Sequence, residues 1–333
     1  MKFALPSKLD TALALVRSGD LAAATAAIQA SLGSPAARPT RAAAGETALP
    51  RIGGRPQGNF APARYAGPEG TLDYHLYRPS TAAAGMPLLV MLHGCTQDPE
   101  DFARGTGMNA VAEQLGMLVA YPRQPQSANA QKCWNWFRPG DQNRGGGEPA
   151  LIAAATRAIL AEADGDAARV YVAGLSAGGA AAAILAAAYP ELFAAVGVHS
   201  GLACGAARDL PSALAAMRSG ARAAPSGDAR FVPVITFHGD RDTTVNAANA
   251  QAIVAQATAL HPAPLATTVE DLGGHVRATS TDRAGRIVIE QWTVRGGGHA
   301  WSGGSRTGSY ADPGGPDASR EMARFFLTHR LAG

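Results

Sequence analysis

One serine stands at the junction of two different hydrophobic patterns. Residues 170–173 form a short apolar run, the pattern of a strand that is buried on both faces, and residues 177–188 consist almost wholly of good helix formers. Between them lies Gly174-Leu175-Ser176-Ala177-Gly178. A G-x-S-x-G pentapeptide at a strand-to-helix corner holds its serine in a strained turn, with glycines where a Cβ would clash, so that the hydroxyl projects outward. This context favours Ser176 as a nucleophile over an ordinary Gly-Ser turn.

Composition sets the broad class of the chain. It has 333 residues, 47% of them hydrophobic, which is enough to bury the core of one large α/β domain with an appendage. A net charge of +3 without a lysine or arginine stripe argues against nucleic-acid binding, and no apolar run reaches membrane-spanning length. The first ten residues lack the continuous apolar segment of an export signal, so the cytoplasm is the default expectation. Uncharged substrates fit this composition best, and nothing in the sequence indicates an oligomeric state.

Three segments differ in composition along the chain. Residues 1–33 predict a small N-terminal helical hairpin with a break at Gly19-Asp20. Residues 34–58 are rich in proline, glycine, alanine and arginine and predict a linker. Residues 59–333 are expected to form the catalytic domain, because every candidate site residue lies there.

Predicted strands and helices alternate through the third segment. The predicted strands are 72–77, 87–92, 117–121, 170–173, 195–198, 232–237 and 287–294, and the predicted helices are 101–115, 148–163, 177–188, 247–260 and 319–331. This alternation indicates an α/β fold with a mostly parallel central sheet and helices on both faces. In such a sheet the functional site is expected at the carboxyl ends of the strands.

A serine hydroxyl needs a base to act as a nucleophile near neutral pH, and a carboxylate must orient that base. His299 is the best candidate base, because it follows the last predicted strand on a flexible glycine-rich loop; a surface histidine is the alternative. Asp240 and Asp242 both follow the strand that ends at 237, and Asp242, further out on the loop, is the better candidate acid. The chain order Ser176, Asp242, His299 is the order of an α/β-hydrolase fold.

A site for acyl transfer also needs hydrogen-bond donors where the oxyanion develops. The backbone amide of Ala177, directly after the nucleophile, is one candidate. The second is expected from the loop after the strand at 87–92, and we assign it to the amide of Cys95. His93 is expected to be a structural hydrogen bonder beneath this loop.

Several motifs together resemble the poly(3-hydroxybutyrate) depolymerase esterase family. They are Leu92-His-Gly-Cys-Thr-Gln97, Gly105-Thr-Gly-Met-Asn109, Cys133-Trp-Asn-Trp-Phe137, Gly147-Glu148-Pro149, Arg169 to Gly179, Tyr189-Pro190, His238-Gly-Asp-Arg-Asp242 and Gly298-His-Ala-Trp301. The resemblance runs from about residue 65 to the C-terminus.

The resemblance implies an α/β-hydrolase fold with Ser176, Asp242 and His299 as the catalytic triad. It implies a serine carboxylesterase acting on short-chain hydroxyalkanoate polyesters or oligomers, so the expected partner is a small-molecule or polymeric ester. Feruloyl and acetyl-xylan esterases are near relatives and give the alternative within enzymes. A catalytically idle binding module on the same fold is the alternative from another class. Members of the family that are secreted leave an extracellular location open.

Aromatic residues are the remaining clue to a binding site. Trp134, Trp136 and Trp301 are expected on loops that ring the site, with a place in the core as the alternative for Trp134 and Trp136. Trp301, two residues after His299, is expected to contact the acyl or alcohol group. No zinc spacing, P-loop or dinucleotide fingerprint is present, so neither a metal nor a cofactor is expected.

A disulfide between Cys95 and Cys133 is a further expectation. The strands at 87–92 and 117–121 are expected to be adjacent, which brings the loops that follow them together. Both cysteines also lie inside motifs that resemble those of the family, whereas Cys204 does not. The missing export signal argues against the bridge, because disulfides are rare in the cytosol.

Overall fold

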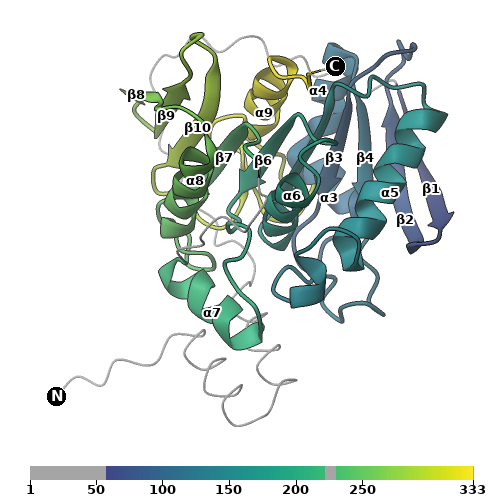
Figure 1. The fold of residues 1–333 in the computed structure, drawn as a ribbon, viewed down its shortest axis with the longest axis horizontal. Coiled ribbons are helices and arrows are strands. Elements are labelled where there is room, and N and C mark those ends of the chain that lie inside the picture. Colours follow the sequence, from purple (N-terminus) through teal and green to yellow (C-terminus); the bar gives the residue numbers. More distant parts are fainter. Residues whose placement is uncertain (1–57, 222–229, 333) are drawn as a thin grey trace. The chain divides into compact units, whose positions relative to one another are not determined.

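A ten-stranded mixed sheet organises the part of the chain that the computed structural model describes, residues 58–221 and 230–332 (Figure 1). The strand order is β1-β2-β4-β3-β5-β6-β7-β10-β9-β8. The strands are β1 (Asn59–Gly67), β2 (Gly70–Arg78), β3 (Leu88–Leu92), β4 (Leu118–Pro122), β5 (Val170–Leu175), β6 (Ala195–His199), β7 (Val234–Gly239), β8 (Ala266–Asp271), β9 (His275–Thr281) and β10 (Ile287–Val294). Two further short strands, β11 (Trp301–Ser302) and β12 (Ala311–Asp312), pair with each other.

The centre of the sheet is parallel. Strands β4, β3, β5, β6, β7 and β10 all run in one direction, and the antiparallel pairings lie at the two edges of the sheet. Central parallel strands are buried on both faces, and every residue of β3, β4 and β5 is buried accordingly. The predicted α/β-hydrolase fold is confirmed for the described residues.

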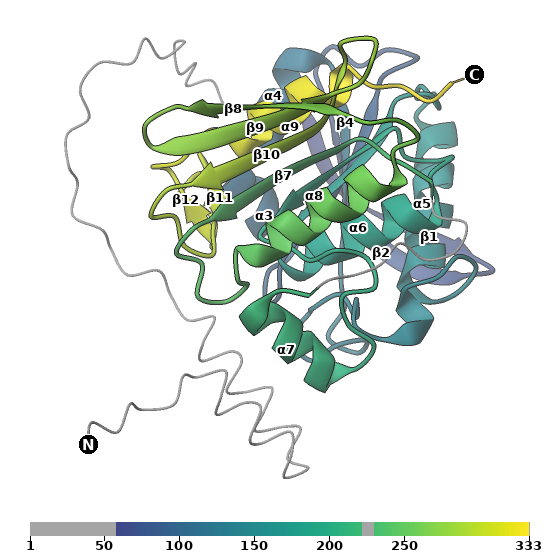
Figure 2. The same ribbon diagram turned by 60° about the vertical axis from the view of Figure 1, so that its left-hand side comes forward.

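Helices cover both faces of the sheet (Figures 1 and 2). They are α3 (Pro99–Thr106), α4 (Met108–Leu115), α5 (Gly147–Glu162), α6 (Ala177–Ala188), α7 (Leu210–Ser219), α8 (Ala248–Leu260) and α9 (Ala318–Leu327), with a 3₁₀ turn at Pro139–Asp141. Alternate residues of β5 point to opposite faces: Tyr171 packs in the cluster with α3, α4 and α9, and Val172 packs in the cluster with α5, α6 and α8. Two core layers therefore enclose the strand that carries the nucleophile.

The structure corrects three expectations about single elements. The helix predicted at 101–115 is two helices, because Gly107 adopts a left-handed conformation with φ of 64° and ends α3. Strands β1, β8 and β9 were not expected, because all three lack a continuous apolar run; β1 and β8 are largely exposed, and β9 is mostly half-buried. Helix α7 was not expected either, although Asp209 and Ser212 form a capping box at its start.

The predicted N-terminal hairpin (1–33) and all of the predicted linker except Gly58 lie outside the described residues. Within the described part of the chain, no helix is long and apolar enough to cross a membrane.

Gly197 gives a test of how tightly β6 packs against α9. A Cβ at this position would lie 2.8 Å from the sulfur of Met322 and 2.9 Å from Cζ of Phe326. We expect Gly197→Ala to lower the free energy of unfolding by about 1–3 kcal/mol through overpacking. Gly140→Ala is the control, because nothing lies within 4 Å of its added Cβ. Urea unfolding that shows equal stability for the two variants would contradict this packing.

Candidate active site

Ser176 occupies a strained corner between β5 and α6. Its backbone has φ of 58° and ψ of −118°, a region that residues with a side chain rarely adopt. Its carbonyl accepts a hydrogen bond from the amide of Ala180, so Ser176 also begins the helix. Such strain is typical of a serine that is held out of the regular strand and helix for a functional reason.

The glycines beside Ser176 are required by close backbone approach. A Cβ on Gly178 would lie 2.0 Å from the carbonyl oxygen of Leu92 and 2.6 Å from that of His93. A Cβ on Gly174 would lie 2.3 Å from the backbone of Gly178. The corner is therefore docked directly on the end of β3, and any side chain at either glycine would push the two apart.

The candidate acid and base are in direct contact. Nδ1 of His299 lies 2.7 Å from Oδ2 of Asp242, and the exposed fractions of the two side chains are 9% and 0%. The other carboxylate oxygen, Oδ1, accepts the backbone amides of Thr244 and Val245. The carboxylate is thus fixed by its own loop on one side and orients the imidazole on the other.

The electrostatics of Asp242 favour its charged form. Burial by itself raises the pKa of this carboxyl, but the charge of His299 and the hydrogen bond from His238 outweigh it, and the net pKa lies well below its usual value. His238 is buried, with Nε2 lying 2.8 Å from the carbonyl of Val245 and 3.4 Å from Oδ2 of Asp242. Asp242 therefore stays an anion beside His299.

Asp240 has a different place. Its Oδ1 accepts the amide of Gly296 at 2.5 Å, and the residue is exposed. The amide of Arg241 donates to the carbonyl of Gly297, and a Cβ on Gly239 would lie 2.3 Å from that same carbonyl. Backbone contacts thus hold the loop that carries His299 against the loop that carries Asp242. Asp240 is part of this support and makes no contact with His299 among the described residues.

His199 connects the nucleophile corner to the segment after the base. The amide of Ser176 donates to the carbonyl of His199, and the amide of Ser302 donates to Nε2 of its ring at 3.0 Å. The ring also stacks on Trp301 with centroids 5.0 Å apart. Burial, helped by the neighbouring imidazoles His238 and His299, lowers the pKa of His199 to about 3, so the ring is neutral and Nε2 remains an acceptor.

The strand order places these groups at one edge of the sheet. Ser176, Asp242 and His299 follow β5, β7 and β10, and His199 is the last residue of β6; these four strands are parallel and are consecutive neighbours in the sheet. Their loops therefore meet at the carboxyl ends of these strands, as in other open parallel sheets. Nothing in the sequence pattern singled out His199, whereas His238 lies inside a motif that was noted only for its aspartates.

The two candidate oxyanion donors are free. Among the described residues, no acceptor lies within hydrogen-bond distance of the amide of Cys95 or of Ala177. Ala177 is in the first turn of α6, where amides lack a partner inside the helix and the helix dipole favours negative charge. His93 is a structural hydrogen bonder as expected: Nδ1 contacts the carbonyl of Gly94, and Nε2 accepts the amide of Gln124.

The disulfide between Cys95 and Cys133 is confirmed, with Cα atoms 4.2 Å apart. It joins the candidate oxyanion loop, residues 94–97, to the segment at 133–137, which carries two tryptophans. Glu148 at the start of α5 holds the same segment by accepting the amide of Asn135 at 2.7 Å and the side-chain amide of Asn135 at 2.5 Å. Burial raises the pKa of Glu148, although the hydrogen bonds from Asn135 and Gln124 oppose that effect.

The three tryptophans have different surroundings. Trp301 is 1% exposed and donates its indole N–H to Ser319, which corrects the expectation that it contacts the acyl or alcohol group. Trp134 is also 1% exposed and donates to the carbonyl of His93, so it belongs to the core. Trp136 is 7% exposed and packs in the cluster that contains Ala177 and contacts Cys95. Of the three, only Trp136 belongs to the hydrophobic cluster that contains Ala177.

The chemistry available at this edge is nucleophilic. A strained serine, an imidazole paired with a buried carboxylate and two free amides are the groups that acyl transfer requires. In residues 58–221 and 230–332, no group of three or more histidine, cysteine, aspartate or glutamate side chains is arranged to hold a metal ion.

Comparisons with known proteins point to one kind of enzyme. A family model described as "Esterase PHB depolymerase" matches residues 72–290. Poly(3-hydroxyalkanoate) depolymerase C of Paucimonas lemoignei is 34% identical over 258 residues, which are 74% of this chain and 60% of that protein. Feruloyl esterase B of Neurospora crassa is 35% identical over 130 residues, or 39% of this chain and 44% of that protein.

The fold also matches a solved structure. The acetyl xylan esterase from Aspergillus awamori superimposes with a TM-score of 0.64 at 22% identity, covering 81% of this chain and 99% of that one. This likeness shows a shared fold. The chain spans 60% of the length of the Paucimonas relative and 44% of the Neurospora one.

Removing the disulfide tests whether it supports the site. We expect replacement of Cys95 and Cys133 by alanine to lower the free energy of unfolding by about 2–4 kcal/mol and to lower the rate of acyl transfer, because the Cys95 amide loses its anchor. Cys204→Ala is the control: burial raises the pKa of this thiol to about 11, and it takes no part in the bridge. Urea unfolding with and without reductant measures the difference. A free Cys133 thiol in fully active protein, seen by mass spectrometry after alkylation, would refute the role of the bridge.

Proposed function

Because the chain belongs to the esterase PHB depolymerase family, we propose that it is a serine carboxylesterase that hydrolyses esters of short-chain hydroxyalkanoates, as polyester or oligomer. The observation that carries the proposal is the 2.7 Å contact between His299 and the buried Asp242, at the same sheet edge as the strained Ser176. The relative named for a depolymerase matches about twice as many residues as the feruloyl esterase does, which favours the hydroxyalkanoate substrate.

In the proposed first step, His299 removes the proton of Ser176, and Oγ attacks the carbonyl carbon of the ester. The carbonyl oxygen becomes an oxyanion that the amides of Cys95 and Ala177 stabilise, and removing one such donor typically costs about 10²–10³ in kcat. His299 then gives the proton to the leaving alcohol oxygen, and the carbon–oxygen bond of the ester breaks. An acyl-enzyme on Ser176 remains.

The second step runs the same chemistry with water. His299 takes a proton from water, the resulting hydroxide attacks the acyl carbon, and the oxyanion forms again between the two amides. Collapse of this tetrahedral intermediate releases a carboxylic acid, and His299 returns the proton to Ser176. Asp242 acts throughout by holding Nδ1–H of His299, so that the other ring nitrogen is free to exchange protons.

Substrate contact is proposed for Trp136. It belongs to the hydrophobic cluster that also contains Ala177, and it lies edge-to-face with Phe137, with ring centroids 5.8 Å apart. An aromatic surface beside the oxyanion amides suits the uncharged acyl chain of a hydroxyalkanoate. The same surface also suits a feruloyl group. A feruloyl esterase is therefore the second candidate function, and the match to feruloyl esterase B supports it.

The disulfide bears on where the protein works. Disulfides persist in oxidising compartments and are rare in the cytosol. The Cys95–Cys133 bridge therefore supports an oxidising compartment for the active protein, in place of the cytoplasm expected from the first ten residues of the sequence.

A substrate panel tests the proposed function. We expect hydrolysis of short p-nitrophenyl esters and of hydroxybutyrate oligomers or film to exceed hydrolysis of methyl ferulate and of acetylated xylan. A fluorophosphonate should label wild-type protein at Ser176 and leave Ser176→Ala unlabelled. Folded wild-type protein that takes up no label would instead indicate an idle binding module. Preference for methyl ferulate would select the feruloyl esterase candidate, and preference for acetylated xylan would indicate an acetyl-xylan esterase.

Two aspartate variants test the assigned acid. We expect Asp242→Asn to lower kcat by about 10⁴-fold, because the asparagine holds the imidazole in the wrong tautomer. Asp240→Asn is the matched control and should lower kcat by about tenfold or less, since the carboxylate of Asp240 accepts the backbone amide of Gly296 and makes no hydrogen bond to His299 among the described residues. Steady-state kinetics on one p-nitrophenyl ester compares them. A larger loss in the Asp240 variant would show that the acid is misassigned.

A further inference from the structure

Gln97 is a buried polar residue that the reaction described above does not use. It lies two residues after Cys95, its side chain is 2% exposed, and both ends of its amide make hydrogen bonds. A buried side-chain amide is tolerated when its donors and its acceptor are all satisfied. Its contacts therefore show what it holds in place.

The oxygen of this amide fixes the start of the oxyanion loop. Oε1 of Gln97 accepts the backbone amide of Gly94 at 3.0 Å, and the backbone amide of Gln97 donates to the carbonyl of Gly94 at 3.3 Å. The two bonds set the orientation of the peptide groups on both sides of Gly94. The next amide along the chain, that of Cys95, has no acceptor among the described residues. Gln97 thus occupies the amide of Gly94 and leaves the amide of Cys95 open to a substrate oxygen.

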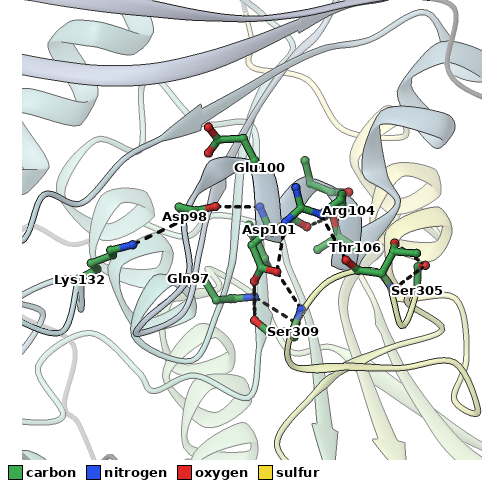
Figure 3. A network of polar contacts seen from close by, with 12 residues as sticks. Gln97, Asp98, Glu100, Asp101, Arg104, Thr106, Lys132, Ser305 and Ser309 are labelled. Atoms are coloured by element: carbon green, nitrogen blue, oxygen red, sulfur yellow. Dashed lines mark hydrogen bonds and ion pairs between the residues drawn. The ribbon is translucent and has the colours of Figure 1, made fainter. Parts of the chain in front are cut away.

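The nitrogen of the same amide can point in only one direction. Nε2 of Gln97 lies 3.0 Å from Oδ2 of Asp101, 3.1 Å from the carbonyl of Ser309 and 3.2 Å from Oγ of Ser309. All three are acceptors, so a reversed amide would set its oxygen against them. Figure 3 shows Gln97 between Asp101 and Ser309 in this network. The contacts of Nε2 with Asp101 and Ser309 therefore hold the amide in the orientation in which Oε1 accepts the backbone amide of Gly94.

The anchor belongs to the segment that follows the base. Asp101 accepts the amide of Ser309 at 3.0 Å, and the amide of Ser305 donates to the carbonyl of Gly105 at 2.8 Å. A Cβ on Gly308 would lie 2.3 Å from the amide nitrogen of Gly105, so the two backbones are in direct contact. Residues 305–309 are consequently fixed to α3, and they lie six to ten positions after His299.

From these contacts we propose that Gln97 is a positioning residue that holds the Cys95 amide in the oxyanion hole, anchored through Asp101 and Ser309. The inference rests on the proposed function, because it concerns how the transition state of that reaction is stabilised. Among the described residues, Gln97 makes no hydrogen bond to Ser176. It acts through the peptide groups around Gly94, and it complements the disulfide, which holds Cys95 by its side chain.

Gln97→Met tests the role, because methionine has similar length but neither accepts the Gly94 amide nor donates to Asp101. We expect kcat to fall about 10- to 100-fold, which is no more than the fall in kcat when one oxyanion donor is removed. KM should change by about twofold or less. Gln114→Met is the control: Gln114 is an exposed residue whose Oε1 accepts Arg320 at 2.9 Å. Rates are normalised to active sites titrated with a fluorophosphonate, so that unfolded protein does not count.

Inhibitor binding separates positioning from a general loss of structure. A trifluoromethyl ketone adds to Ser176 and places an oxyanion in the hole, whereas the uncharged alcohol product binds without an anionic oxygen. We expect the ketone to lose affinity by the same factor as kcat, and the alcohol to bind within about twofold of wild type. Wild-type-like kcat and ketone affinity in folded Gln97→Met would overturn the inference and leave the proposed function intact. Wild-type protein without hydrolysis or label would instead overturn the proposed function.

A charge exchange keeps the test decisive if the methionine variant fails to fold. In Gln97→Glu the introduced carboxylate faces that of Asp101, and we expect kcat to fall at least about tenfold. Adding Asp101→Asn restores a donor opposite the introduced carboxylate, and we expect it to recover at least about fivefold of that loss. Absence of recovery in the folded double variant would rule out the anchor through Asp101.

Discussion

The rest of the site depends on one close contact of backbone with backbone, between Gly178 and the end of β3. The carbonyls of Leu92 and His93 lie where a side chain at Gly178 would be. This contact locks the first turn of α6 to the strand whose loop carries Cys95, and so sets the two oxyanion amides relative to each other. Because backbone atoms have no rotamers, the contact fixes the geometry more closely than a pair of side chains would.

The loops of the acid and the base are also held together by contact of backbone with backbone, but here the contact encloses charged and polar side chains. Gly239 and Gly297 bring their two loops together by backbone contact, and the buried carboxylate of Asp242 then faces the imidazoles of His238 and His299. A buried anion is stable only beside a compensating charge or donors. Burial holds His199 neutral. In the proposed reaction the positive charge develops on His299, next to the carboxylate of Asp242, which stabilises it.

The sequence was informative where a local rule determines the structure. The G-x-S-x-G corner follows from a strand-to-helix turn motif, and the buried parallel strands follow from their apolar runs. The pairing of Cys95 with Cys133 follows from strand ends that meet at one sheet edge. Trp301 shows where such reasoning stops, because closeness to His299 along the chain does not give the direction of a side chain. As a residue of the short strand β11 it packs under the site against Phe102 and His199. His199 and Gln97 lack a sequence signal, since each acts through contacts with distant segments.

The oxyanion loop illustrates why a precise site can be built on irregular backbone. Thr96 adopts φ of 67°, so the four residues from Gly94 to Gln97 have little intrinsic preference for their conformation. The disulfide restrains the loop from the side of Cys133, and Gln97 restrains it from the side of Ser309. Glu148 fixes the segment that carries Cys133 through its bond with Asn135. The hydrogen bond of Ser305 with Gly105 fixes the segment that carries Ser309. Two independent supports on opposite sides remove the freedom that either alone would leave, which is the condition for stabilising an oxyanion without reorganisation.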